Sequence, residues 1–162
     1  MTMKTITRTT AEENPTGPDY HEASTRDGEI ALALGHADLS TRDFETALEN
    51  FSLATQLLPK RAAAHAGQAL ALQSLGRSSE ASHAALHAVS LDPSNATALK
   101  VLARIHLDAG QPEAAQNACR RILKANLADA DALNLLREAI TQEAKLAENI
   151  VDVRPRMAGQ PA

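Results

Sequence analysis

Residues 62–95 read AAAHAGQALALQSLGRSSEASHAALHAVSLDPSN, and this stretch decides the fold because it holds two helical patterns separated by a stop signal. The spacing of its apolar residues predicts a first helix over 63–74, which Gly76 would end by adopting a left-handed backbone conformation. Ser78 offers an N-cap for a second helix, and Pro93 would end that helix because proline disfavours helical geometry in the residue before it. The stretch therefore predicts a pair of helices joined by a tight turn.

A period of 34 residues repeats this pattern on both sides of the stretch. Pro59 and Pro93 are 34 residues apart, and so are Gly76 and Gly110. The same interval separates three alanines, Ala47, Ala81 and Ala115. A fixed interval shared by unrelated residue types indicates a repeat array, in which each helix pair buries its apolar face by stacking on its neighbours.

The repeat units predict one helical domain over residues 28–150. Its expected parts are units over 28–61, 62–95 and 96–129 and a capping helix over 130–150. Asp129 lies where it can cap this last helix. The apolar stripe expected to pack on the third unit consists of Leu133, Leu136, Ile140, Ala144 and Ala147. The segments 1–27 and 151–162 are polar or contain proline and glycine, so both are expected to be flexible.

The spacing resembles that of the tetratricopeptide repeat. Within 62–95, the resemblance is carried by Ala69, Gly76, Ala81, Ala85, Ala88 and Pro93. The matching residues of the other units are Leu34, Gly35, Ala47, Phe51, Ala54 and Pro59, then Leu102, Ala103, Gly110, Ala115 and Ile122. The resemblance implies an all-α fold, a right-handed α-solenoid of antiparallel helix pairs.

In tetratricopeptide proteins the first helix of each unit lines a concave groove, so the resemblance implies that these helices meet the partner. Matching by register gives the following residues for the partner-binding concave face: Leu32, His36, Leu39, Ala66, Leu70, Gln73, Lys100, Val101, Arg104, Asp108, Asn134 and Glu138.

The residue types on that face predict the kind of partner. Lys100 and Arg104 fall on successive helical turns beside an apolar strip that includes Leu70 and Val101. Such a surface suits an amphipathic helix or an extended peptide with apolar anchors and an acidic residue at one end. A surface pair of Arg104 with Asp108, beside a solvated Lys100, is the alternative that the sequence leaves open.

The composition argues against several other classes of function. The formal net charge is −4 and aromatic residues make up 2% of the chain, so binding to nucleic-acid phosphates and stacked bases is not expected. No apolar run approaches the roughly 18 residues that a membrane span needs. Because the first residues also lack the apolar core of a secretory signal, we expect a cytoplasmic protein without membrane insertion.

Residues that could carry chemistry have simpler structural explanations. His83 and His87 are four residues apart and could share a metal, but further ligands are missing, so a surface location is expected. His65 and His106 fall at repeat positions where family members carry aromatic rings. Cys119 is the only cysteine, and its register predicts a buried thiol. We therefore expect no catalytic residue, no metal and no cofactor.

These observations predict a non-catalytic protein interaction module of bacterial type, an adaptor or assembly scaffold that binds a peptide or an amphipathic helix. One alternative is a substrate-holding chaperone, because three units and a final helix are similar to type III secretion translocator chaperones. Another is a repeat subunit or fragment associated with a glycosyltransferase or methyltransferase, since residues 129–139, DADALNLLREA, resemble repeats attached to such enzymes. Self-association through the terminal helix is a further expected mode of contact.

Overall fold

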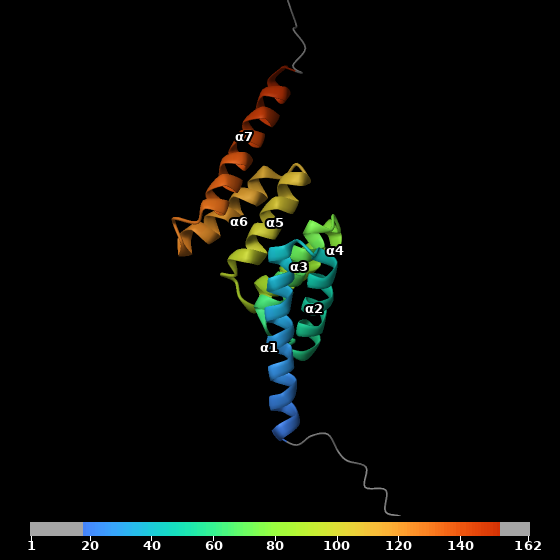
Figure 1. The fold of residues 1–162 in the computed structure, drawn as a ribbon. Helices are drawn as coiled ribbons and strands as arrows, with labels where there is room; N and C mark the ends of the chain where they lie inside the picture. Colours follow the sequence, from blue (N-terminus) through green and yellow to red (C-terminus); the bar gives the residue numbers. More distant parts are fainter. Residues whose placement is uncertain (1–17, 153–162) are drawn as a thin grey trace, which may run out of the picture.

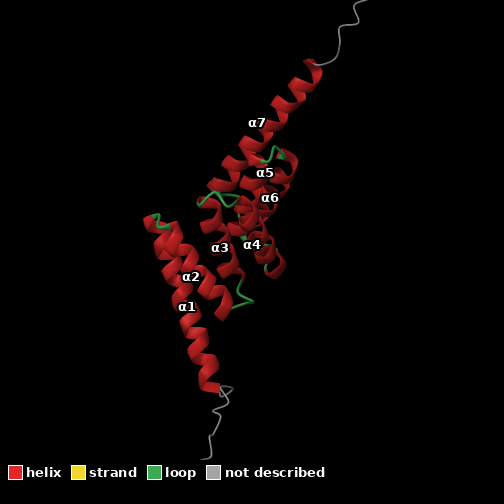
Figure 2. Cartoon of the chain, turned by 90° about the vertical axis from the view of Figure 1, so that its right-hand side faces the viewer, coloured by secondary structure: helices red, strands yellow, loops and turns green. Residues whose placement is uncertain are grey.

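Seven α-helices make up the part of the chain that the computed structural model describes, residues 18–152 (Figure 1). They are α1 (Pro18–Thr41), α2 (Phe44–Leu57), α3 (Ala62–Ser74), α4 (Ser78–Leu91), α5 (Ala96–Asp108), α6 (Pro112–Ala125) and α7 (Ala130–Asp152). Loops join them, and the described residues contain no strand (Figure 2). The predicted all-α fold class is confirmed.

Consecutive helices form antiparallel pairs that stack into a right-handed solenoid (Figure 1). The pairs are α1 with α2, α3 with α4, and α5 with α6, and α7 packs on the last of them. The first helices α1, α3, α5 and α7 also contact one another in order, whereas the second helices of the described pairs do not contact each other. The first helices therefore line the inner side of the solenoid and the second helices its outer side.

The helix boundaries follow signals that act over a few residues. Gly76 and Gly110 have φ angles of 75° and 70°, and each lies directly after the end of a first helix. The side chains of Asn95 and Asp129 cap α5 and α7 by accepting hydrogen bonds from backbone N–H groups three residues later, at 3.0 and 2.9 Å. The predicted cap at Ser78 is wrong, because Ser78 is already the first residue of α4.

The first helix begins earlier than the sequence predicts. Residues 18–27, expected to be flexible, are helical, and the expected boundary at Gly28 lies inside α1. This glycine marks close packing rather than a boundary, since a Cβ atom there would lie 2.6 Å from Leu58 Cγ. The start of α1 projects beyond the end of α2 (Figure 1). The expectations for residues 1–17 and 153–162 concern parts of the chain outside the described residues.

A core of small residues around one aromatic ring holds α1, α2 and α3 together. Phe51 of α2 is completely buried. Its ring lies against Gly35 of α1, where a Cβ atom would approach to 2.9 Å, and against Gly67 of α3, where a Cβ atom would overlap the ring. Glycine at both positions lets the three helices close around the ring.

In the pairs α3 with α4 and α5 with α6, alanine is the small residue that lets the two helices approach closely. Ala69 and Ala81 are completely buried where α3 meets α4, and Ala103 and Ala115 are completely buried where α5 meets α6. The sequence predicts these close approaches, and the structure confirms them.

The last helix packs through a different face from the predicted stripe. The buried residues of α7 are Ala132, Leu135 and Ala139, and Leu136 is partly buried. The other residues of the predicted stripe, Leu133, Ile140, Ala144 and Ala147, are exposed. By the 34-residue period Leu133 corresponds to Leu99, which is completely buried among residues of α6. No described helix follows α7 to cover the corresponding face, and this face therefore stays exposed.

Candidate functional site

The inner side of the solenoid holds a recess of about 590 Å³ between α3, α5 and α7. We call it the groove recess, and it is lined by Gln73, Ser74, Lys100, Arg104, Asp108, Asp131, Asn134 and Leu135. Gln73, Lys100, Arg104, Asp108 and Asn134 are also among the residues that the sequence assigns to the partner-binding face. The structure therefore brings these five side chains together.

Lys100 is held by two carboxylates from the start of α7. Its Nζ lies 2.9 Å from Asp129 Oδ1 and 3.0 Å from Asp131 Oδ2. Partial burial alone would lower the pKa of Lys100, but hydrogen bonds to both carboxylates outweigh burial and raise it above its usual value. The pKa of Asp129 is lowered, first by the Ala132 backbone N–H and then by Lys100. The solvated Lys100 considered from the sequence is therefore wrong.

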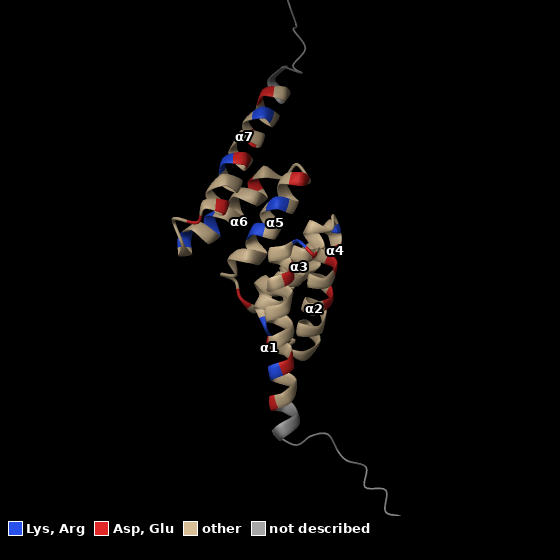
Figure 3. Cartoon of the chain, in the orientation of Figure 1, with Lys and Arg blue, Asp and Glu red and all other residues tan. Residues whose placement is uncertain are grey.

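Arg104 also reaches across to α7. Its Nη1 lies 2.8 Å from Glu138 Oε1, and the two side chains are 40% and 50% exposed. A pair this exposed contributes about 0.2–1 kcal/mol. The alternative pairing of Arg104 with Asp108 is wrong, because the Asp108 side chain forms no hydrogen bond or ion pair with any described residue. Lys100 and Arg104 are thus both paired with acidic residues of α7 or its N-cap. Figure 3 marks the basic positions of α5 and the acidic positions of α7 along the ribbon.

Gln73 brings an unsatisfied hydrogen-bond donor to the groove recess. Its Nε2 atom is buried and has no hydrogen-bond partner among the described residues. Buried amides without a partner are uncommon, because losing water without a replacement costs about 1–3 kcal/mol. A bound segment with a free carbonyl oxygen would satisfy this donor after rotation of the side-chain amide.

Three residues assigned to the partner-binding face belong to the core instead. Leu32, Ala66 and Val101 are only 7%, 2% and 1% exposed. The assignment is wrong for them because the first helices pack on one another, and their mutual contacts bury this part of each helix. Of the predicted apolar strip only Leu70 stays accessible, and it is partly buried. Leu39, another residue assigned to this face, is also partly buried.

The remaining residues assigned to this face are accessible. His36 is exposed, and its ring meets Phe51 edge-on with 5.2 Å between ring centroids. Asn134 and Glu138 are exposed on α7. The accessible inner surface thus runs from His36, over the partly buried Leu70, to the groove recess.

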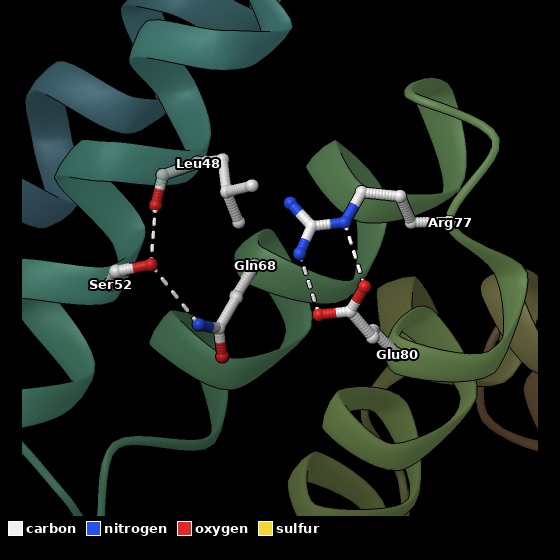
Figure 4. Close-up of polar contacts among 5 residues, drawn as sticks. All are labelled: Leu48, Ser52, Gln68, Arg77 and Glu80. Atoms are coloured by element: carbon white, nitrogen blue, oxygen red, sulfur yellow. Dashed lines mark hydrogen bonds and ion pairs between the residues drawn. The ribbon is translucent and has the colours of Figure 1, made fainter.

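A second recess, of about 570 Å³, lies on the outer side between α2, α3 and the start of α4. Figure 4 shows part of it: the Gln68 amide donates to Ser52 Oγ, which donates to the Leu48 carbonyl oxygen, and opposite them Arg77 and Glu80 form a two-point ion pair at 2.6 and 2.7 Å. This recess was not predicted from the sequence. It lies where two second helices diverge, and no local sequence pattern indicates such a place.

The structure pairs two histidines that the sequence analysis treats separately. The rings of His65 and His87 meet edge-on with 4.2 Å between centroids, and His65 Nε2 lies 2.9 Å from the Pro59 carbonyl oxygen. The pKa of His65 is lowered, chiefly by burial and further by the charge of His87, against the opposing effect of the Pro59 hydrogen bond. His87 remains on the surface as predicted, as does His83.

We expect acid to destabilise the protein through His65. A histidine with a lowered pKa is neutral in the folded state but takes up a proton on unfolding, so its stabilising contribution is complete above about pH 6.5 and is lost as pH falls through the folded pKa. Between pH 7.5 and 5.5 the urea midpoint of the wild type should therefore fall more than that of His65→Gln. The exposed His83→Gln serves as the control and should follow the wild type. Equal pH dependence of wild type and His65→Gln would contradict the assignment.

Other potential chemical groups have structural roles. Cys119 is completely buried, and burial raises the pKa of its thiol, which keeps it in the unreactive protonated form. No group of three or more histidine, cysteine or acidic residues within residues 18–152 is placed to hold a metal ion. None of the described helices combines the length and apolar character that crossing a membrane would require.

Comparisons with known proteins agree with this architecture. Residues 72–140 match the family described as "Tetratricopeptide repeat". The chain is similar to the first TPR domain of human RPAP3 (17% identity, TM-score 0.71, covering 76% of this chain and 98% of that domain). It is also similar to the first TPR of Spaghetti (RPAP3) bound to the HSP90 peptide SRMEEVD (18% identity, TM-score 0.70, 74% and 98% covered). A third similar structure is the TPR2B domain of yeast Sti1 in complex with pHsp70 (19% identity, TM-score 0.66, 72% and 98% covered). No curated protein matches the chain.

Proposed function

We propose that the chain is a non-catalytic module that binds a segment of another protein on the inner side of α1, α3, α5 and α7. The support is that residues 72–140 match the tetratricopeptide repeat family and that the described helices fit about three repeats and a final helix. The observation that carries the proposal is the groove recess, where a buried Gln73 amide lacks an acceptor and the α5 cations are fixed in place. An extended peptide or a helix would supply carbonyl groups and apolar side chains to such a surface.

We expect the apolar part of this surface, Leu39 and Leu70, to provide most of the binding energy. Leu39 and Leu70 are partly buried, so a partner's apolar side chain would complete their burial. Anchors of this kind carry a large share of affinity, whereas exposed charges mainly set orientation and association rate. His36 and Asn134 mark the two ends of the accessible surface.

Within this class, we propose an adaptor or assembly scaffold. The support is that repeat helices and the closing helix occupy residues 18–152, while the similar structures include domains with peptides of other proteins bound to them. The identity of the partner separates this role from the two alternatives: an exported substrate would indicate a holding chaperone, and a glycosyltransferase or methyltransferase would indicate an enzyme-associated repeat subunit.

The proposal is tested by placing a photo-reactive amino acid at Asn134 on the inner side or at His83 on the outer side of the full chain. We expect irradiation in native lysate to crosslink one partner through position 134 and not through position 83. Purified partner should then bind Leu70→Asp about tenfold or more weakly than wild type. Leu86→Asp, which places the same substitution on the 54% exposed outer surface, is the matched control.

A second variant covers the case in which Leu70→Asp loses its fold. Ser74 is exposed at the rim of the groove recess, so Ser74→Trp fills the recess without removing a core contact. Ser79→Trp on the outer helix α4 is its control. Unchanged affinity in folded Ser74→Trp, or crosslinking only through position 83, would move the binding site away from the inner side.

A further inference from the structure

The groove recess, taken with the residues that contact its lining, carries more negative than positive charge. Its cations are Lys100 and Arg104. The carboxylates that line it or contact these cations are Asp108, Asp129, Asp131 and Glu138. Asp108 and Asp131 line the recess, whereas Asp129 and Glu138 lie next to it. One further cation, Arg137, lies next to the lining residue Asn134, so four carboxylates and three cations leave this region with a net negative charge.

Both cations are already engaged within the chain. Lys100 has carboxylate partners at 2.9 and 3.0 Å, and Arg104 has one at 2.8 Å. An acidic group of a partner would compete with Asp131 or Glu138 for these cations, so it would replace or weaken an existing ion pair. A cationic group of a partner meets no such competition, because the Asp108 side chain has no hydrogen-bond or ion-pair partner among the described residues.

The exposure of the acidic residues makes them available to a partner. Asp131 and Glu138 side chains are 76% and 50% exposed even while they contact the α5 cations. Each carboxylate can accept further hydrogen bonds from lysine or arginine, since an ionised carboxyl group has two oxygens and about four acceptor positions. Gln73 supplies a buried donor that lacks an acceptor within the described residues, and a main-chain carbonyl of the same bound segment suits it.

We propose that the groove recess selects a partner segment that carries lysine or arginine. This inference rests on the proposed function of the inner side as the binding surface. It assigns the opposite charge preference to the one that the sequence analysis derives from Lys100 and Arg104. A basic segment would also differ in charge from the acidic HSP90 peptide SRMEEVD that is bound to the similar Spaghetti domain.

The acidic residues of α7 are therefore expected to set the preference of the recess for basic segments. Asp131 and Glu138 occupy the sites on Lys100 and Arg104 that an acidic peptide would need. Replacing them by Asn and Gln keeps their size, removes two negative charges, frees Arg104 and leaves Lys100 with Asp129 as its one carboxylate partner among the described residues. The double variant Asp131→Asn with Glu138→Gln is therefore expected to shift the preference of the recess from basic to acidic segments.

The test is selection of a random peptide library displayed on phage against the folded full-length chain. We expect peptides selected on wild type to be enriched in lysine and arginine and depleted in aspartate and glutamate. A selected peptide should bind about tenfold more tightly than its counterpart with glutamate at the basic positions, and the difference should shrink at high salt. The Asp131→Asn, Glu138→Gln variant should lose or invert the preference.

Two controls separate the possible results. Glu45→Gln with Glu113→Gln changes the net charge equally on second helices, and it should keep the wild-type preference. Ser74→Trp should abolish binding of the selected peptides. Peptides that Ser74→Trp blocks but that are acidic or uncharged would overturn the basic preference while leaving the inner side as the binding surface. Peptides that Ser74→Trp does not block, or the absence of any selected peptide, would overturn the proposed binding surface itself.

Discussion

Removing residues 130–162 is expected to destroy the native state or to produce an aggregating protein, which is the largest effect that the structure predicts. The deletion takes away Ala132, Leu135 and Ala139 and uncovers the third repeat's core, including Leu107 and Leu123. Each large aliphatic side chain returned to water costs about 1.5–3 kcal/mol, and a small domain has only about 5–15 kcal/mol of stability in total. Size-exclusion chromatography and urea denaturation followed by helical circular dichroism measure the outcome.

The shorter deletion of residues 153–162 is the control for this experiment. It leaves α7 and every described contact in place, so its chromatographic behaviour and denaturation midpoint should match those of the full chain. A monomer lacking residues 130–162 with the stability of the full chain would show that α7 does not cap the array.

Gly67→Ala is expected to have the largest effect of any single substitution considered. The added Cβ would overlap the ring of Phe51, which is completely buried and also lies close to Gly35 on its other neighbouring helix. Overpacking of this kind costs about 1–3 kcal/mol or more, which outweighs the gain of about 1 kcal/mol from placing alanine rather than glycine in a helix. Gly35→Ala should cost less stability than Gly67→Ala, because its Cβ would lie 2.9 Å from the same ring instead of overlapping it.

A double mutant isolates the steric cause. Phe51→Leu alone should destabilise by leaving space in the core, and in the Gly67→Ala background the smaller side chain should relieve the overlap. The two free-energy changes should therefore fall short of additivity by about 1 kcal/mol or more when the midpoints of urea denaturation are compared. Additive costs would show that Phe51 is not what excludes a Cβ atom at residue 67.

Much of the fold can be predicted from the sequence because its signals are local. Gly76 and Gly110 end helices through their own backbone conformation, and Asn95 and Asp129 cap helices through bonds to N–H groups three residues away. The early start of α1 was missed because its first turns carry polar residues. Their sequence resembles that of a flexible segment, and a helix propensity alone does not separate the two.

The candidate site is less predictable because its contacts join residues far apart in the chain. The period placed Lys100 and Arg104 on the inner side, yet the residues that neutralise them, Asp131 and Glu138, lie 31 and 34 positions later. Their approach depends on how α7 packs against α5, which the sequence pattern does not specify. The charge of the groove recess could therefore not be read from the cations alone.

By itself the sequence determined the repeat length, the helix pairs, the glycine stops and the cap at Asp129, because these depend on periodicity and on chemistry within a few residues. It also determined the close approaches at Ala69, Ala81, Ala103 and Ala115. Only the tertiary structure decided which face of α7 is buried. Its two apolar faces have similar sequence patterns, and the neighbour that covers one of them is fixed by packing. Tertiary packing also placed Leu32, Ala66 and Val101 in the core and surrounded the α5 cations with carboxylates, because burial and charge pairing depend on helices that the linear pattern does not position.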